Sequence, residues 1–208
     1  MRPSARGRAA LNGDCPRRAR ATITVLTIGH STRTLEDFIA LLKAHGVTRV
    51  VDVRTVPRSR RNPQFNRDAL PDALAAAGIG YTHLPGLGGL RHARKDSLNT
   101  GWRNASFRGY ADYMQTPQFD ENLNALIELA THERIAIMCA EAVPWRCHRS
   151  LIADALTVRG IRVEHIMSET QRNPHQMTAF AKAEGTRITY PEPASQPSLP
   201  RRSAACDK

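Results

Sequence analysis

The chain of 208 residues has few aromatic residues, only four cysteines and no long apolar run. Its longest apolar stretches, such as residues 135–140, have the length of a strand and fall far short of the ~20 residues that a membrane-spanning helix needs. Four cysteines are too few for a disulfide scaffold, and residues 1–20 lack the apolar segment of a secretory signal. We therefore expect a cytoplasmic protein in a reducing compartment, without membrane association.

Several common sequence signatures are also missing. No two cysteines form a C-x-x-C pair, and the glycines at 86–89 do not form the G-x-G-x-x-G of a dinucleotide-binding turn. No helix-turn-helix, zinc-finger or RNA-binding signature is recognisable. The hydrophobic fraction of 41% and the chain length fit a single α/β domain.

The formal net charge of +11 is concentrated at the two ends of the chain. Residues 1–20 contribute +5 and residues 186–208 contribute +2, which leaves +4 for residues 21–185. We expect disordered tails at 1–21 and 186–208 around one folded domain at 22–185. Because flexible basic tails attract polyanions only nonspecifically, a nucleic-acid partner is an alternative and not the main expectation.

Strands and helices are expected to alternate between residues 23 and 166. Apolar runs predict strands at 23–29, 49–54, 80–84, 134–139 and 162–166. Helical spacing predicts helices at 35–45, 68–77, 107–130 with a break near Pro117, 150–159, and a short one near 176–183. This alternation predicts a three-layer, doubly wound α/β fold, with a mostly parallel five-stranded sheet and helices on both faces.

A strand order of 3-2-1-4-5 would make the first and fourth strands neighbours. Ligands of such sheets bind beyond the carboxyl ends of the strands, at the point where the strand order reverses. Here those ends carry residues 29–31 (Gly-His-Ser) and 139–141 (Cys-Ala-Glu), and the second strand brings Asp52 and Arg54 nearby. We therefore expect the functional site at this edge of the sheet.

Four motifs in and around this edge resemble those of a known family. They are GHST at 29–32, DVRTVPRSRRNPQF at 52–65, LPGLGG at 84–89 and CAEAVPWRCHR at 139–149. On these motifs the chain, over roughly residues 23–168, is similar to the family called domain of unknown function 488. The resemblance implies a compact α/β fold and functional motif cysteines, here Cys139 and Cys147, but no particular reaction.

Residues 135–156 concentrate the reactive side chains of the chain. Cys147 lies at the start of an expected helix, where the helix dipole and the charges of Arg146, His148 and Arg149 would lower the pKa of a thiol. Cys139 ends a buried strand and is either a reactive thiol or a small core residue. Seven residues separate the two thiols, which permits a disulfide without requiring one.

Glu141 and His30 are the candidate proton carriers. Each has a second interpretation: Glu141 could form a salt bridge with Arg146 or Arg149, and His30 could hydrogen-bond the backbone. We take Cys139, Cys147, Glu141 and His30 as the candidate catalytic residues.

A zinc site would need Cys139, Cys147, His148 and His30 to converge on one ion. Short paired spacing is absent, and the adjacent residues Cys147 and His148 would seldom both face the same metal. The sequence therefore predicts no metal site and requires no cofactor.

Arginines give the strongest collective signal, because their planar forks suit phosphate or carboxylate groups. The candidate anion-binding residues are Arg54, Arg58, Arg146, Arg149, Ser31 and His148. Further arginines in the long connection at 85–108 could fold over the site as a lid. Ser31 could instead cap the first helix.

Together these patterns predict a thiol-dependent hydrolase or transferase whose arginine-rich crevice binds a phosphorylated or nucleotide-like small anion. Two other classes stay open. One is a nucleic-acid-binding or regulatory module, and the other is a redox sensor that uses Cys139 and Cys147. The sequence does not determine the oligomeric state.

Overall fold

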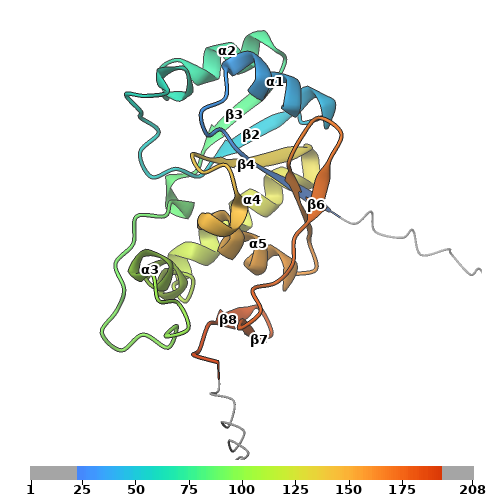
Figure 1. The fold of residues 1–208 in the computed structure, drawn as a ribbon. Coiled ribbons are helices and arrows are strands. Elements are labelled where there is room, and N and C mark those ends of the chain that lie inside the picture. The colour runs from blue at the N-terminus through green and yellow to red at the C-terminus, as the bar shows by residue number, and fades with distance from the viewer. Residues whose placement is uncertain (1–22, 194–208) are drawn as a thin grey trace, which may run out of the picture.

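A six-stranded sheet forms the middle layer of the computed structural model, which describes residues 23–193 (Figure 1). The strands are β1 (Thr24–Gly29), β2 (Arg49–Asp52), β3 (Gly80–His83), β4 (Ile135–Cys139), β5 (Arg162–Ile166) and β6 (Arg172–Pro174). Their spatial order is β3-β2-β4-β1-β5-β6. The first five pair in parallel and β6 pairs antiparallel with β5.

Helices cover both faces of the sheet. One face carries α1 (Leu35–Ala44) and α2 (Leu70–Ala76), and the other carries α3 (Ala105–Tyr113), α4 (Pro117–His132) and α5 (Arg149–Thr157) (Figure 1). Alternate residues of β4 show the two cores, since Ile135, Ile137 and Cys139 pack toward α4 and α5, whereas Ala136 and Met138 pack toward α1 and α2. The predicted three-layer α/β fold is confirmed.

The helix boundaries follow from capping residues in the sequence. The Thr34 side chain accepts from the backbone N–H of Asp37 at the start of α1. The break predicted near Pro117 is confirmed, because Thr116 caps α4 and Pro117 occupies its first turn, where a missing N–H costs nothing. None of the helices within residues 23–193 has the length and apolar character needed to cross a membrane.

The predicted strand order is wrong in one respect. β1 and β4 are neighbours as expected, but β4 lies between β2 and β1 and so separates the first two strands. β1 and β4 are both apolar and buried, so the residue pattern predicts two central strands. It does not predict which of the two lies beside β2. The sheet also has a sixth strand, the short antiparallel β6, whose three exposed residues carry no strand pattern.

The C-terminal part also differs from the prediction. Residues 176–183 form no helix. A hairpin of β7 (Lys182–Glu184) and β8 (Arg187–Thr189) follows, turning at Gly185 with a φ of 61°. Ile188 and Tyr190 are buried in the core, so the fold continues past the expected boundary at 185. The tail expected at 1–21 lies outside the described residues, as do residues 194–208 of the tail expected at 186–208.

Candidate functional site

The carboxyl ends of β1, β2 and β4 meet at one edge of the sheet. Gly29 is in register with Cys139, and Asp52 is in register with Met138. The chain stays paired just beyond the strands, because the backbone N–H of His30 donates to the carbonyl of Cys139 over 3.0 Å. The predicted location of the side chains is therefore confirmed. Because strand side chains alternate, Cys139 faces α5, whereas His30 lies with the α1 side of the sheet.

Gly29 lets the loop after β4 cross directly against β1. A Cβ atom on residue 29 would lie 1.7 Å from the carbonyl oxygen of Glu141 and 2.9 Å from Nη2 of Arg149. No side chain larger than hydrogen fits there, which gives the glycine of the GHST motif a physical reason. The same contact fixes how closely the loop that carries both cysteines approaches the end of β1.

The two cysteines of this loop are side by side. The Sγ atoms of Cys139 and Cys147 are 2.7 Å apart, and both thiols are free. The one-turn 3₁₀ helix at Pro144–Arg146 reverses the chain and returns Cys147 to the end of β4. Both residues are almost fully buried, with 2% and 4% of their surface exposed.

The environment separates the two thiols electrostatically. Burial acts to raise the pKa of Cys147, but hydrogen bonds from Cys139 and His148, with the charges of His148 and Arg149, hold it well below its usual value. Burial and the hydrogen bond to Cys147 raise the pKa of Cys139 well above its usual value. These opposite directions favour Cys147 as the thiol that ionises and Cys139 as the thiol that keeps its proton. The backbone N–H of Arg149 also points at this sulfur over 3.5 Å.

Arg149 is a buried cation, with 1% of its surface exposed. Its Nη2 donates to the carbonyl of Glu141 over 2.7 Å, and its Nη1 donates to Oγ1 of Thr27 over 3.3 Å. Within residues 23–193 it forms no salt bridge with a carboxylate, and its Nε has no hydrogen-bond partner. A buried cation is costly without an opposite charge, and the charge of Arg149 acts on the nearby Cys147 thiol, whose pKa it helps to lower.

A second polar cluster occupies the α1 side of the same edge. Arg54 binds both carboxylate oxygens of Asp52, over 2.9 and 2.6 Å, and donates to the carbonyl of Phe65 over 2.7 Å. The hydroxyl of Tyr81 also donates to Asp52. Arg54 was predicted to bind an anion, but its charge is already balanced by the buried Asp52 carboxylate, and only Nη1 retains a free N–H.

His30 completes this second cluster. Its Nδ1 donates to the carbonyl of Ser31 over 2.9 Å, its Nε2 accepts from Arg54 over 3.2 Å, and its ring stacks on Phe65. Burial lowers the pKa of His30 to about 4, so the ring is neutral at pH 7. The predicted backbone hydrogen bond is confirmed, and the role as a proton carrier stays a prediction.

Two adjoining cavities open over these clusters. The first, which we call the thiol pocket, has a volume of about 360 Å³ and is lined by Cys139, Cys147, His148, Arg146 and Glu141, among others. The second, which we call the arginine pocket, has a volume of about 350 Å³ and is lined by Arg58, Arg61, His30 and Ser31, among others. Both share Arg54, Val56 and Ala140 as a common wall. The predicted residues are thus divided between two neighbouring cavities, except for Arg149, which is buried and lines neither of them.

The surface residues of these pockets are only partly as predicted. The Glu141 carboxylate is exposed and forms no salt bridge with Arg146 or Arg149, so that prediction is wrong; its backbone carbonyl binds Arg149 instead. Arg58 and Arg146 are exposed and have no ion-pair partner in the described part of the chain.

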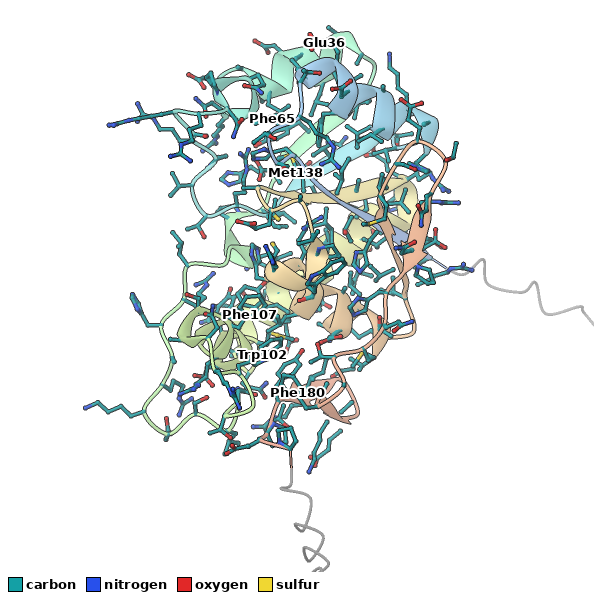
Figure 2. The ribbon with its side chains drawn as sticks, viewed as in Figure 1. Glu36, Phe65, Trp102, Phe107, Met138 and Phe180 are labelled. Carbon is teal, nitrogen blue, oxygen red and sulfur yellow. The ribbon has the colours of Figure 1, made fainter. Side chains whose placement is uncertain are left out.

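The arginines of the long connection brace the fold instead of facing the site. Arg91 lies over the ring of Tyr113 at 3.5 Å and bonds the carbonyls of residues 86 and 88. Arg94 pairs with Asp96, and Arg108 donates to the carbonyl of Trp102. Trp102, Phe107 and Phe180 form an aromatic cluster below the sheet (Figure 2).

The candidate zinc ligands do not converge. Among residues 23–193, no three His, Cys, Asp or Glu side chains are arranged to hold a metal ion. His30 belongs to the cluster on the α1 side, where Arg54 occupies its Nε2. The sulfur atoms face α5, beside His148.

Sequence reasoning missed a set of buried polar side chains behind Arg149, which are Thr27, His165, His175 and Asp154. The available signal was a threonine in the mostly apolar β1 and a histidine in β5, at positions paired across the two strands. Such residues need hydrogen-bond partners when they are buried.

Comparison with known protein families supports the resemblance. The family described as Domain of unknown function DUF488 matches residues 34–156, which include the segments 52–65 and 139–149 but not the GHST motif. The match is shorter than the range of 23–168 suggested by the motifs, yet it covers more than half of the chain. No curated protein and no solved structure gave a significant match. The fold and the matched range together establish that the chain belongs to the DUF488 family.

Proposed function

We propose that this protein is a thiol-dependent enzyme in which Cys147 attacks an electrophilic centre of a small substrate. The observation that carries the proposal is the Cys147 sulfur in the wall of the thiol pocket, beside a protonated Cys139 and the buried Arg149. A thiolate held between a hydrogen-bond donor and a cation is the reactive form of cysteine. Free thiols at this position fit the cytoplasmic setting that we infer.

The two pockets support a substrate with two different parts. Val56 and Leu90, with 61% and 73% of their surface exposed, give the thiol pocket an apolar rim together with Phe107. The arginine pocket offers Arg58 and Arg61, whose charges are unpaired in the described chain. We infer that an apolar electrophilic part enters the thiol pocket while a phosphate, as in a phosphorylated or nucleotide-like ligand, binds the arginines.

The chemistry proceeds in two displacements. Cys147 donates a sulfur electron pair to the electrophilic carbon or phosphorus, and the bond to the leaving group breaks with its electrons. The leaving group takes a proton, for which the Glu141 carboxyl at the pocket wall is the available carrier. Water or another acceptor then displaces the sulfur, which returns as thiolate, and the choice of acceptor decides between hydrolysis and transfer.

The test is a screen of phosphorylated esters and thioesters, with covalent adducts detected by peptide mass spectrometry. We expect an adduct on Cys147 and a loss of turnover in Cys147→Ser. Glu141→Gln should lower kcat about 10²-fold as a lost acid–base group. Arg58→Ala should raise KM with little change in kcat. The matched control is Arg134→Ala, because Arg134 is an exposed arginine that precedes β4, at the end of this strand opposite to Cys139. The proposal fails if Cys147→Ser and Glu141→Gln leave a discovered activity intact.

A second candidate, a redox sensor, is favoured by the 2.7 Å separation of Cys139 and Cys147. A peroxide would oxidise the Cys147 thiolate to a sulfenic acid, and the Cys139 sulfur would then displace water to form a disulfide. The peroxide supplies the oxidising equivalents, and a cellular thiol would restore the reduced pair. Binding or activity that is equal under oxidising and reducing conditions would exclude this candidate.

A further inference from the structure

A continuous set of hydrogen-bonded side chains lies behind Arg149, on the α5 side of the sheet. We call it the buried polar chain, and its members are Thr27, His165, His175 and Asp154. They come from β1, from β5, from the segment after β6 and from α5. Thr27 and Asp154 are fully buried, and 7% of His165 is exposed.

The links of this chain are all within hydrogen-bond distance. Nη1 of Arg149 lies 3.3 Å from Oγ1 of Thr27, which lies 2.8 Å from Nδ1 of His165. Nε2 of His165 lies 3.1 Å from Nδ1 of His175. Nε2 of His175 lies 2.7 Å from Oδ1 of Asp154. The chain therefore connects a buried guanidinium to a buried carboxylate through one hydroxyl and two imidazole rings.

The chemistry of the two ends sets the outer bonds. Because a guanidinium can only donate and a carboxylate can only accept, Thr27 accepts from Arg149 and His175 donates to Asp154. Burial lowers the pKa of His165 to about 4, so this ring is neutral at pH 7 and accepts at one nitrogen while it donates at the other. With the Thr27 hydroxyl as the donor to Nδ1, His165 donates from Nε2 to His175.

Asp154, at the end of the buried polar chain away from Arg149, is held by several hydrogen bonds. The Asp154 carboxylate also accepts from the backbone N–H and hydroxyl of Thr178, over 3.1 and 2.7 Å, and from the hydroxyl of Tyr190 over 2.9 Å. A carboxylate with this many donors cannot reorient without breaking several bonds. The fixed Asp154 carboxylate therefore orients the two histidine rings, and His165 in turn orients the Thr27 hydroxyl so that its oxygen accepts from Arg149.

We propose that the buried polar chain is a positioning network that holds the Arg149 guanidinium as a fixed countercharge beside the Cys147 sulfur. This inference rests on the proposed role of Cys147 and adds residues from other elements, of which Thr27 lies 122 positions from Arg149 in sequence. Arg149 depends on this support because its Nε is unpartnered and its remaining side-chain contacts are to backbone carbonyls.

The test compares two isosteric changes at the start of the chain. Thr27→Val keeps the shape of the side chain but removes the hydroxyl, whereas Thr27→Ser keeps the hydroxyl. The readout is the pH dependence of iodoacetamide alkylation at Cys147, followed peptide by peptide in the full chain by mass spectrometry. We expect Thr27→Val to raise the apparent pKa of Cys147 by about one unit, as weakened contact with a cation does, and Thr27→Ser to leave it unchanged.

A second pair covers the case in which Thr27→Val does not fold. His165→Leu removes the acceptor for Thr27, while His165→Asn places an amide oxygen near the position of Nδ1 and should restore the wild-type profile. A wild-type Cys147 with an ordinary thiol pKa would overturn the proposed function itself. A low wild-type pKa that is the same in folded Thr27→Val and His165→Leu would overturn the positioning network alone.

Discussion

The sulfur atoms of Cys139 and Cys147 lie 2.7 Å apart, although seven residues separate them along the chain. The strand end at Cys139 is fixed by its neighbours in the sheet, and the turn at Pro144–Arg146 returns Cys147 to it. A disulfide bond has a length of about 2.05 Å, so the two sulfurs could be joined with a small displacement.

Mild oxidation should therefore link Cys139 to Cys147. In a chain with Cys15→Ser and Cys206→Ser, diamide treatment should yield one intramolecular disulfide, identified as a cross-linked peptide that reductant separates. The Cys147→Ser variant in the same background is the control and should give no such peptide. Two thiols that remain free under conditions that oxidise glutathione would contradict the observed proximity.

Gly29→Ala should destabilise the fold strongly, because the new Cβ would overlap the carbonyl of Glu141 at 1.7 Å. We expect the free energy of unfolding to fall by about 3 kcal/mol or more, since backbone has to move. Gly78→Ala is the matched control: its φ is 77° and no atom lies within 4 Å of the new Cβ, so about 1 kcal/mol of backbone strain is expected. Equal losses in urea denaturation would show that the loop does not press on β1.

Asp52→Asn should be far more costly than a comparable change at the surface. The substitution leaves Arg54 as a buried cation without a counterion, for which a loss of about 3–5 kcal/mol is expected. Glu133→Gln breaks the half-exposed pair with Arg49 and should cost less than about 1 kcal/mol. Similar unfolding midpoints for both variants would mean that Arg54 is hydrated and free to bind a ligand.

Acid should weaken the protein through two buried histidines. Burial lowers the pKa of His30 and of His165 to about 4, below the ordinary value of 6.5. Protons therefore bind the unfolded chain more readily, and stability present above pH 6.5 is lost as the pH falls toward 4. At pH 5 each histidine should cost about 2 kcal/mol relative to pH 7.

Urea unfolding at pH 7 and pH 5 checks this expectation. His30→Gln should reduce the difference between the two pH values, whereas His132→Gln, at an exposed position, should leave it unchanged. A wild-type stability that stays constant between pH 7 and pH 5 would contradict the buried, neutral state of both rings.

The sequence predicted the layers of the fold and the edge of the sheet that carries the site. Apolar runs and helix caps such as Thr34 depend on neighbouring residues only, so the helices and strands that they predict agree closely with those of the structure. The position of β4 between β2 and β1 depends on the path of the long connection from β3 to β4. No local residue pattern specifies which strands β4 will pair with. The hairpin at 182–189 was missed because its two strands are only three residues long and, apart from Ile188 and Thr189, exposed, which gives no alternating pattern to recognise.

The site was predicted by residue type but not by pairing. The glycine, cysteine and arginine residues of the motifs gather at the expected edge of the sheet, yet which arginine is neutralised depends on the side of the sheet that each one faces. Asp52 and Arg54 are two residues apart on a strand and its extension, so their pairing could have been read from the alternation of side chains. The buried polar chain joins positions 27, 165, 175 and 154, and such distant contacts follow from the packing of whole elements.

We propose that Cys147 is a thiolate at neutral pH while Cys139 holds the proton. The most direct test is the rate of iodoacetamide alkylation of each cysteine between pH 4 and pH 10, read by peptide mass spectrometry under reducing conditions. We predict an apparent pKa for Cys147 well below the free value of about 8.5, no reaction of Cys139 in that range, and a rise for Cys147 in Cys139→Ala but not in Cys139→Ser. A Cys147 that titrates like a free thiol, or that reacts more slowly than Cys139, would contradict the account.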